Sequence, residues 1–121
     1  MSLTRTLTIE RDARAPARAR EAVAAFADEN LMPDATLLVS ELMTNAVKYG
    51  TGPIGLRLEA GAHGLRCDVA DQGAGFTPKA RSAPATQVGG WGLYLVEELA
   101  SAWGVRDGST HVWFELAVPE D

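Results

Sequence analysis

The stretch from Ile54 to Ala70 constrains the fold of this chain most strongly, because its apolar residues recur at every second position. Apolar side chains occupy alternate positions of 54–58 and again of 65–69, with polar or small residues between them. The link between the two runs, residues 60–64, is short and glycine-rich, as a hairpin requires. These residues therefore predict two antiparallel strands that bury one face and expose the other.

The remaining segments predict further strands and helices around this hairpin. Alternation returns near both ends of the chain, whereas helical spacing with proline in the first turn marks two segments before the hairpin. In chain order, we expect a strand at 3–10, a helix from Pro16 to about Glu29, a helix from Pro33 to Tyr49, strands at 54–59 and 65–70, a helix at about 90–102, and two strands flanking Asp107 and Gly108, the second at 112–118.

This order predicts an α+β fold. We expect a two-layer sandwich in which a mixed, mostly antiparallel sheet of about five strands carries three helices on one face. The 121 residues contain no internal repeat or interdomain linker and suffice to bury a core, so we expect one domain over residues 1–121. Residues 72–89 have no periodicity, and such a long loop in a compact domain is typically functional or mobile.

Composition narrows the classes of function. A net charge of −5 argues against direct nucleic-acid binding. No apolar run is long enough to cross a membrane, and the single cysteine, Cys67, suits a reducing compartment. We therefore expect a cytoplasmic protein in which Cys67 is a small core residue. Early basic residues still leave room for a protein partner at that end, namely Arg5, Arg11, Arg14, Arg18 and Arg20.

The predicted helix that ends at Tyr49 carries an acid, an amide and an amine on one stripe. Glu41, Asn45 and Lys48 are spaced by four and three residues, so they lie side by side on a helix. Such a stripe is often only a solvated face. The chemistry allows more, because an amide oxygen suits Mg²⁺, a carboxylate can orient or deprotonate an attacking hydroxyl, and an ammonium can neutralise phosphate.

An acidic residue with two glycines follows the strand at 65–70. Asp71 continues the alternation of the inward-facing residues, so we expect its side chain to point toward the core. A carboxylate buried there requires a hydrogen-bond donor, and the amino group of adenine would supply one. Gly73 and Gly75 leave room for a flat base. The same residues would also fit an acidic turn followed by flexible glycines.

A second glycine cluster opens the predicted helix at about 90–102. The residues Gly89, Gly90, Trp91 and Gly92 precede the apolar face that begins at Leu93. Free N–H groups and partial positive charge at the start of a helix favour phosphate, and glycines permit its close approach. A flexible hinge that leads into a helix is the other interpretation of this cluster.

The two histidines predict no metal site. His63 lies in the hairpin link and His111 at the start of a predicted strand, and neither has a second ligand at metal-binding spacing. The serines likewise lack the nucleophile motif of a hydrolase. The chemistry of this chain is therefore expected in the three blocks described above.

Together the three blocks resemble a known superfamily, the ATPase domains shared by gyrase-type topoisomerases, heat-shock chaperones, histidine kinases and MutL. Within it, the chain is most similar to the small bacterial anti-sigma-factor serine kinases, and the similarity covers nearly the whole chain. The residues from Ser40 to Gly50 match the asparagine box. Asp71, Gly73 and Gly75 match the first glycine box, and Gly90, Gly92 and Leu93 match the second.

The resemblance implies roles for these residues. Asn45 would be the Mg²⁺ ligand and Glu41 the catalytic acid residue, Asp71 would bind adenine, and Lys48 would contact phosphate. The ATP site and its lid would be shaped by Gly73, Gly75, Gly90, Gly92 and Leu93, with Lys79 and Arg81 as the charged residues of a lid at roughly 76–89.

The resemblance also implies partners and an activity. Such kinases are homodimers that bind a sigma factor and phosphorylate a serine of an anti-anti-sigma protein, which releases the sigma factor. Two other functions fit the same motifs. One is a nucleotide-binding module that regulates partners by binding alone, and the other is the detached catalytic domain of a two-component histidine kinase. The last fits less well, because the chain starts with its own strand and helix and has no phospho-acceptor helix hairpin.

Overall fold

The computed structural model describes residues 2–72, 90–105 and 111–118, with the backbone alone described at 90–94. Its elements match the predicted order of strands and helices. They are β1 (Leu3–Ile9), α1 (Ala15–Phe26), α2 (Met32–Tyr49), β2 (Ile54–Gly61), β3 (Gly64–Ala70), α3 (Gly90–Leu99), β4 (Ala102–Val105) and β5 (Val112–Ala117).

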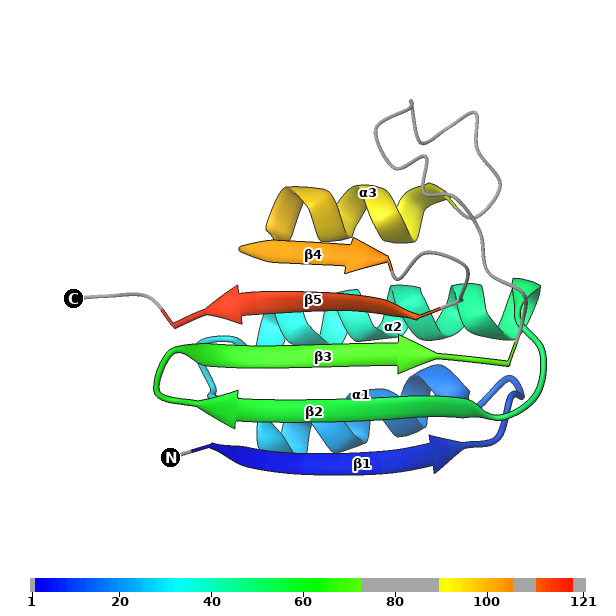
Figure 1. Ribbon diagram of the computed structural model, residues 1–121, viewed down its shortest axis with the longest axis horizontal. Helices are drawn as coiled ribbons and strands as arrows, with labels where there is room; N and C mark the ends of the chain where they lie inside the picture. The colour runs from blue at the N-terminus through cyan, green and yellow to red at the C-terminus, as the bar shows by residue number, and fades with distance from the viewer. Residues whose placement is uncertain (1, 73–89, 106–110, 119–121) are drawn as a thin grey trace.

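The described strands form one sheet in the order β1-β2-β3-β5-β4. Every pair of neighbours in this sheet is antiparallel, so the expectation of a mixed sheet was wrong, while the α+β class is confirmed. Figure 1 shows α1 and α2 behind one face of the sheet, with α3 next to β4. The chain reaches the edge strand β4 after α3 and then returns to the interior as β5.

The first helix ends earlier than the sequence predicts. α1 stops at Phe26 instead of Glu29, and the next residue, Ala27, is already extended. The Asn30 N–H then donates to Asp28 Oδ1 at 2.8 Å, which stabilises a turn. An aspartate that accepts a backbone hydrogen bond two residues ahead competes with the helix for those N–H groups.

The third helix also ends early, at Leu99 instead of 102. The Ser101 N–H donates to the Glu115 carbonyl at 2.8 Å, and β4 begins at the next residue. Pairing with the sheet therefore takes over the backbone groups that would have continued the helix. No helix in the described part of the chain combines the length and apolar character needed to cross a bilayer.

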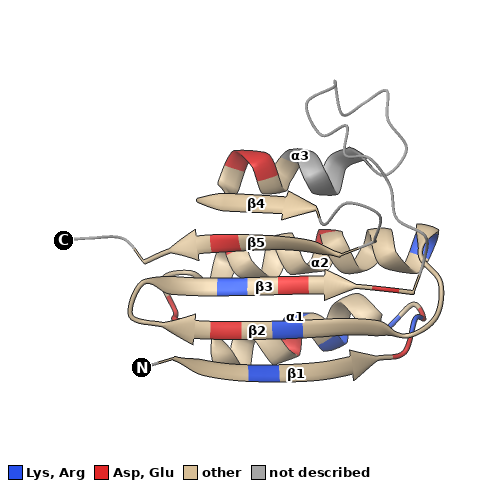
Figure 2. Ribbon diagram, viewed as in Figure 1, with Lys and Arg blue, Asp and Glu red and all other residues tan. Residues whose placement is uncertain are grey.

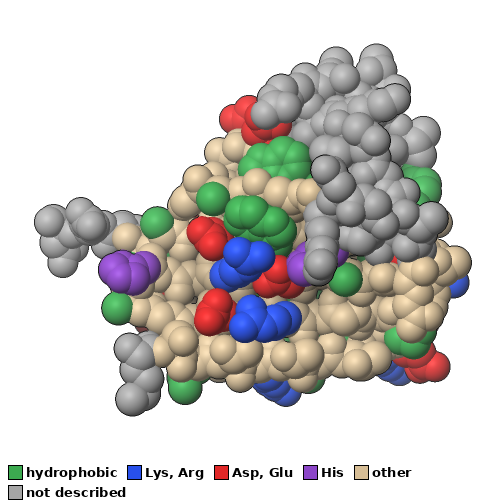
Figure 3. All heavy atoms as spheres, viewed as in Figure 1, with side chains coloured by type: hydrophobic (Ala, Val, Ile, Leu, Met, Phe, Trp, Pro, Cys, Tyr) green, Lys and Arg blue, Asp and Glu red, His purple; other side chains and the backbone are tan. Residues whose placement is uncertain are grey.

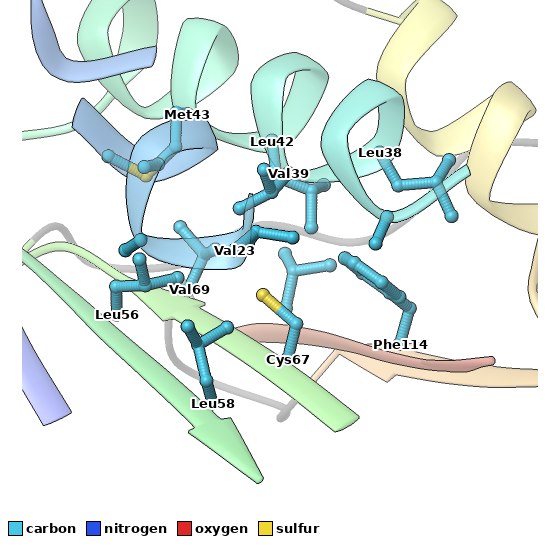
Figure 4. Close-up of a cluster of buried hydrophobic side chains, with 14 of the residues drawn as sticks. Val23, Leu38, Val39, Leu42, Met43, Leu56, Leu58, Cys67, Val69 and Phe114 are labelled. Carbon is cyan, nitrogen blue, oxygen red and sulfur yellow. The ribbon is translucent and has the colours of Figure 1, made fainter. Parts of the chain in front are cut away.

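The core lies between the sheet and the helices (Figure 4). The inward faces of β2, β3 and β5 meet one face of α2 and the inner side of α1, and each fully buried apolar side chain stabilises the fold by roughly 1.5–3 kcal/mol. Cys67 is completely buried in this core, as predicted, and burial raises the pKa of its thiol. The largest fully buried side chains are Phe114, Leu38, Met43, Ile54, Leu56, Leu58, Val23, Val39, Val96 and Cys67.

The edge strand β1 is less buried than its alternation predicts. Ile9 is buried, but Leu3, at the other end of the strand, is 64% exposed. Because β1 has a neighbouring strand on one side only, its first residues receive little cover. The alternation therefore predicted burial correctly at Ile9, the end of β1, and wrongly at Leu3, its beginning.

Candidate functional site

The stripe of Glu41, Asn45 and Lys48 borders the buried side of α2. The packed side of the helix includes Leu42, Met43 and Ala46, which are buried in the core. Glu41 and Asn45 are half-buried, and Lys48 is exposed. Packing of one face thus holds the helix still, and it leaves the amide and the carboxylate half-buried at the border of that face.

The end of α2 lies directly against Asp71. The Gly50 N–H closes the helix by donating to the Ala46 carbonyl at 2.9 Å, and the Thr51 N–H then donates to Asp71 Oδ1 at 3.4 Å. A Cβ at Gly50 would overlap both Asp71 Oδ2 and the Ala46 carbonyl oxygen. Gly50 therefore allows the carboxylate after β3 to approach the helix that carries Asn45.

A second backbone hydrogen bond strengthens this junction. The Gln72 N–H donates to the Thr51 carbonyl at 2.8 Å, so the residues after α2 pair with the residues after β3. Asp71 is half-buried, although the alternation predicts a fully buried carboxylate. The reason is that β3 ends at Ala70, and beyond that residue the core covers less of each side chain.

The beginning of α3 lies at the same end of the molecule. Figure 1 shows the start of α3, the end of α2 and the end of β3 on the same side of the view, and α3 packs against α2. Gly90 and Gly92 occupy the first turn of α3, where helix N–H groups have no partner within the helix. Leu93 belongs to the same helix, and its side chain lies outside the described part.

The structure therefore brings together the blocks that it describes. A hydrogen bond joins Thr51, two residues after the end of α2, to Asp71, and the start of α3 at Gly90 lies at the same end of the molecule. Gly73 and Gly75, and the lid residues Lys79 and Arg81, lie outside the described residues. Lys48 stands in the last turn of α2, where its charge also complements the negative end of the helix dipole.

A charged cluster that the sequence patterns did not indicate lies on the open face of the sheet, opposite the helices (Figures 2 and 3). Asp68 is 7% exposed there and accepts two hydrogen bonds from the Arg66 guanidinium, both at 3.1 Å. His111 Nε2 lies 2.6 Å from Asp68 Oδ1. The Arg66 guanidinium stacks over Trp113, with its Cζ atom 4.4 Å from the centre of the ring. Burial opposes ionisation, but these hydrogen bonds outweigh it and lower the pKa of Asp68.

This cluster is separate from the α2 junction, because Asp68 points away from the helices. Among the residues that the structure describes, no three histidine, cysteine, aspartate or glutamate side chains come close enough to hold a metal ion. Two shallow hollows, of about 570 and 640 Å³, are lined by other residues than Glu41, Asn45 and Asp71. The junction of α2 with Asp71 is the candidate site because it brings Asp71 against the end of the helix that carries Glu41 and Asn45.

Comparison with known families agrees with this geometry. A family model for a histidine kinase-like ATPase domain matches residues 7–116, which include all three blocks. The chain belongs to the histidine kinase-like ATPase family. No curated protein matches it. Because this family consists of ATPase domains, ATP is the ligand against which Asn45 and Asp71 are compared.

The side chains at the junction fit ATP and Mg²⁺. The half-buried Asn45 carries a neutral amide oxygen, which is a ligand type that Mg²⁺ accepts. Asp71 offers a half-buried carboxylate, a suitable acceptor for the amino group of adenine. The absence of a side chain at Gly50 creates the room in which this carboxylate lies. In this site Asn45 would hold the metal ion and Asp71 the base.

Proposed function

We propose that this chain is an ATP- and Mg²⁺-dependent protein serine/threonine kinase that acts as an anti-sigma regulatory factor. It would bind a sigma factor and phosphorylate a serine or threonine of an anti-anti-sigma protein. The observation that carries the ATP-dependent part is the junction at which Thr51, directly after the asparagine box, donates a hydrogen bond to Asp71. Membership of the histidine kinase-like ATPase family supports the use of ATP.

Each residue of the site has a distinct task in this proposal. Asp71 accepts a hydrogen bond from the amino group at C6 of adenine. It so selects this base over guanine, which has a carbonyl oxygen at that position. The Asn45 amide oxygen binds Mg²⁺, which, when bound with ATP, neutralises the charge that develops on the phosphates. Glu41, one helical turn before Asn45, takes the proton from the attacking hydroxyl of the partner.

The partner specificity rests on the sequence resemblance and on surface charge. Two exposed arginines, Arg18 and Arg20, lie in the first half of α1 and supply positive charges for a protein partner. Arg20 also donates to Ser40 Oγ at 2.8 Å, so this arginine is connected to the residue before Glu41. The proposal includes a homodimer in the cytoplasm that touches neither nucleic acid nor membrane.

Calorimetry with ATP, ADP and GTP tests the site before any partner is known. We expect ATP and ADP to bind, GTP to bind far more weakly, and Mg²⁺ to increase the affinity for ATP. Equal affinity for ATP and GTP would contradict the role of Asp71. Absence of ATP binding at millimolar concentration would refute the proposed function.

Phosphotransfer tests the role of Glu41. The change Glu41→Ala is expected to abolish transfer to the partner and to leave ATP affinity unchanged, because the carboxylate acts on the hydroxyl and not on the nucleotide. Glu21→Ala, at an exposed glutamate of α1, is the matched control and should transfer phosphate normally.

The chemical stability of the product separates the competing functions. A phosphoserine or phosphothreonine survives acid, whereas a phosphohistidine is hydrolysed in acid. An acid-labile product would favour a histidine-kinase fragment. If the wild-type protein binds ATP and its partners but transfers no phosphate, a regulatory module that acts by binding alone is the better description.

A further inference from the structure

Arg11 connects two segments that are distant in the sequence. It lies between β1 and α1, and its Nη1 donates a hydrogen bond to the carbonyl of Val47 at 3.0 Å, across 36 positions. Val47 is in the last turn of α2, where carbonyl groups have no partner within the helix. The Arg11 guanidinium therefore caps the end of the helix that carries Glu41 and Asn45.

The segment that holds Arg11 is itself braced. The Arg14 N–H donates to Asp12 Oδ1 at 2.8 Å, and the Asp12 N–H donates to the Glu10 carbonyl at 3.0 Å. Figure 1 shows this connection at the same end of the molecule as the end of α2. Arg11 thus reaches Val47 from a fixed turn.

We propose that Arg11 is a positioning residue for the nucleotide site, a role that rests on the proposed function. Val47 lies between Asn45 and the junction at which Thr51 binds Asp71. A positive charge at a helix C-terminus stabilises the last turn through its carbonyl groups and dipole. Arg11 therefore sets the distance between the metal ligand and the adenine acceptor without contacting ATP.

The first test is ATP affinity, measured by calorimetry with Mg²⁺. Arg11→Ala should weaken ATP binding about two- to fivefold, the size expected from loss of an exposed charge at a helix end. Arg11→Lys should restore most of the affinity, because an ammonium can also donate to a carbonyl. Arg14→Ala removes an exposed arginine of the same turn and is the control, with unchanged affinity expected.

The second test is amide hydrogen exchange without nucleotide. The Gly50 N–H, which donates to the Ala46 carbonyl at the end of α2, should exchange faster in Arg11→Ala than in Arg14→Ala. Equal exchange in the two variants, or unchanged ATP affinity in Arg11→Ala, would overturn the positioning role. A wild-type protein that binds no ATP would refute the proposed function, while the exchange comparison would still decide whether Arg11 holds the helix.

Discussion

Replacement of Gly50 by alanine is the sharpest perturbation that the structure offers, because it adds one methyl group at the junction of α2 with Asp71. The backbone at Gly50 is extended (φ −89°, ψ −179°), which any residue adopts, so backbone strain plays no part. The added Cβ would overlap Asp71 Oδ2 and the Ala46 carbonyl oxygen. The carbonyl belongs to the helix and cannot move alone, so the carboxylate and the end of the helix must separate.

The expected loss follows from the cost of overpacking. An inserted methyl group that forces such a shift costs about 1–3 kcal/mol of unfolding free energy. For a domain of this size that corresponds to a fall in the melting temperature of roughly 4–12 °C. Because the displaced group is Asp71, ATP affinity should fall as well. Thermal unfolding followed by circular dichroism, together with calorimetry, measures both effects.

Gly55→Ala is the matched control. A Cβ at Gly55, in β2, would meet only the Ala70 carbonyl oxygen at 3.6 Å, an ordinary contact. This variant should be as stable as the wild type or slightly more so, with unchanged ATP affinity. If Gly50→Ala unfolds at the wild-type temperature and binds ATP with wild-type affinity, the inference that Asp71 packs closely against the end of α2 is refuted.

Three further outcomes follow from the contacts described. Asp71→Asn should weaken ATP binding about five- to 150-fold, the value of a hydrogen bond to a charged group, and unchanged affinity in calorimetry would remove Asp71 from the site. The lowered pKa of Asp68 means that its contribution to stability is present above about pH 4 and is lost as the pH falls further. Urea unfolding at pH 7 and pH 3 should therefore show a larger loss of stability in the wild type than in Asp68→Asn, and parallel losses would contradict this assignment. Because burial raises the pKa of Cys67, iodoacetamide at pH 8 should label the native thiol far more slowly than in urea, and equal rates would refute its burial.

Local periodicity was a reliable guide to the elements and to their buried faces. The hairpin of β2 and β3 and the buried side of α2 agree with the sequence, because strand and helix geometry repeat every few residues along the chain. Boundaries that depend on the sheet were less accurate. The end of α3 moved to Leu99 because Ser101 bonds to Glu115, a residue of another strand.

Asp68 shows the limit of the alternation. It faces away from the helices, as its place in the strand predicts, yet it is nearly as buried as the core. Its cover comes from Arg66 in the same strand and from His111, which is 43 positions away. Nothing in the local sequence around Asp68 indicates that a histidine will close over it.

The sequence by itself determined that an acid, an amide and an amine share one side of α2. It also determined that Asp71 directly follows a strand with alternate residues facing the core. Only the tertiary structure decided that Asp71 meets the end of α2, through a hydrogen bond across 20 positions, and that Arg11 caps that end across 36. Helical and strand periods fix directions along an element. The packing of one element against another fixes which distant groups come within hydrogen-bond distance.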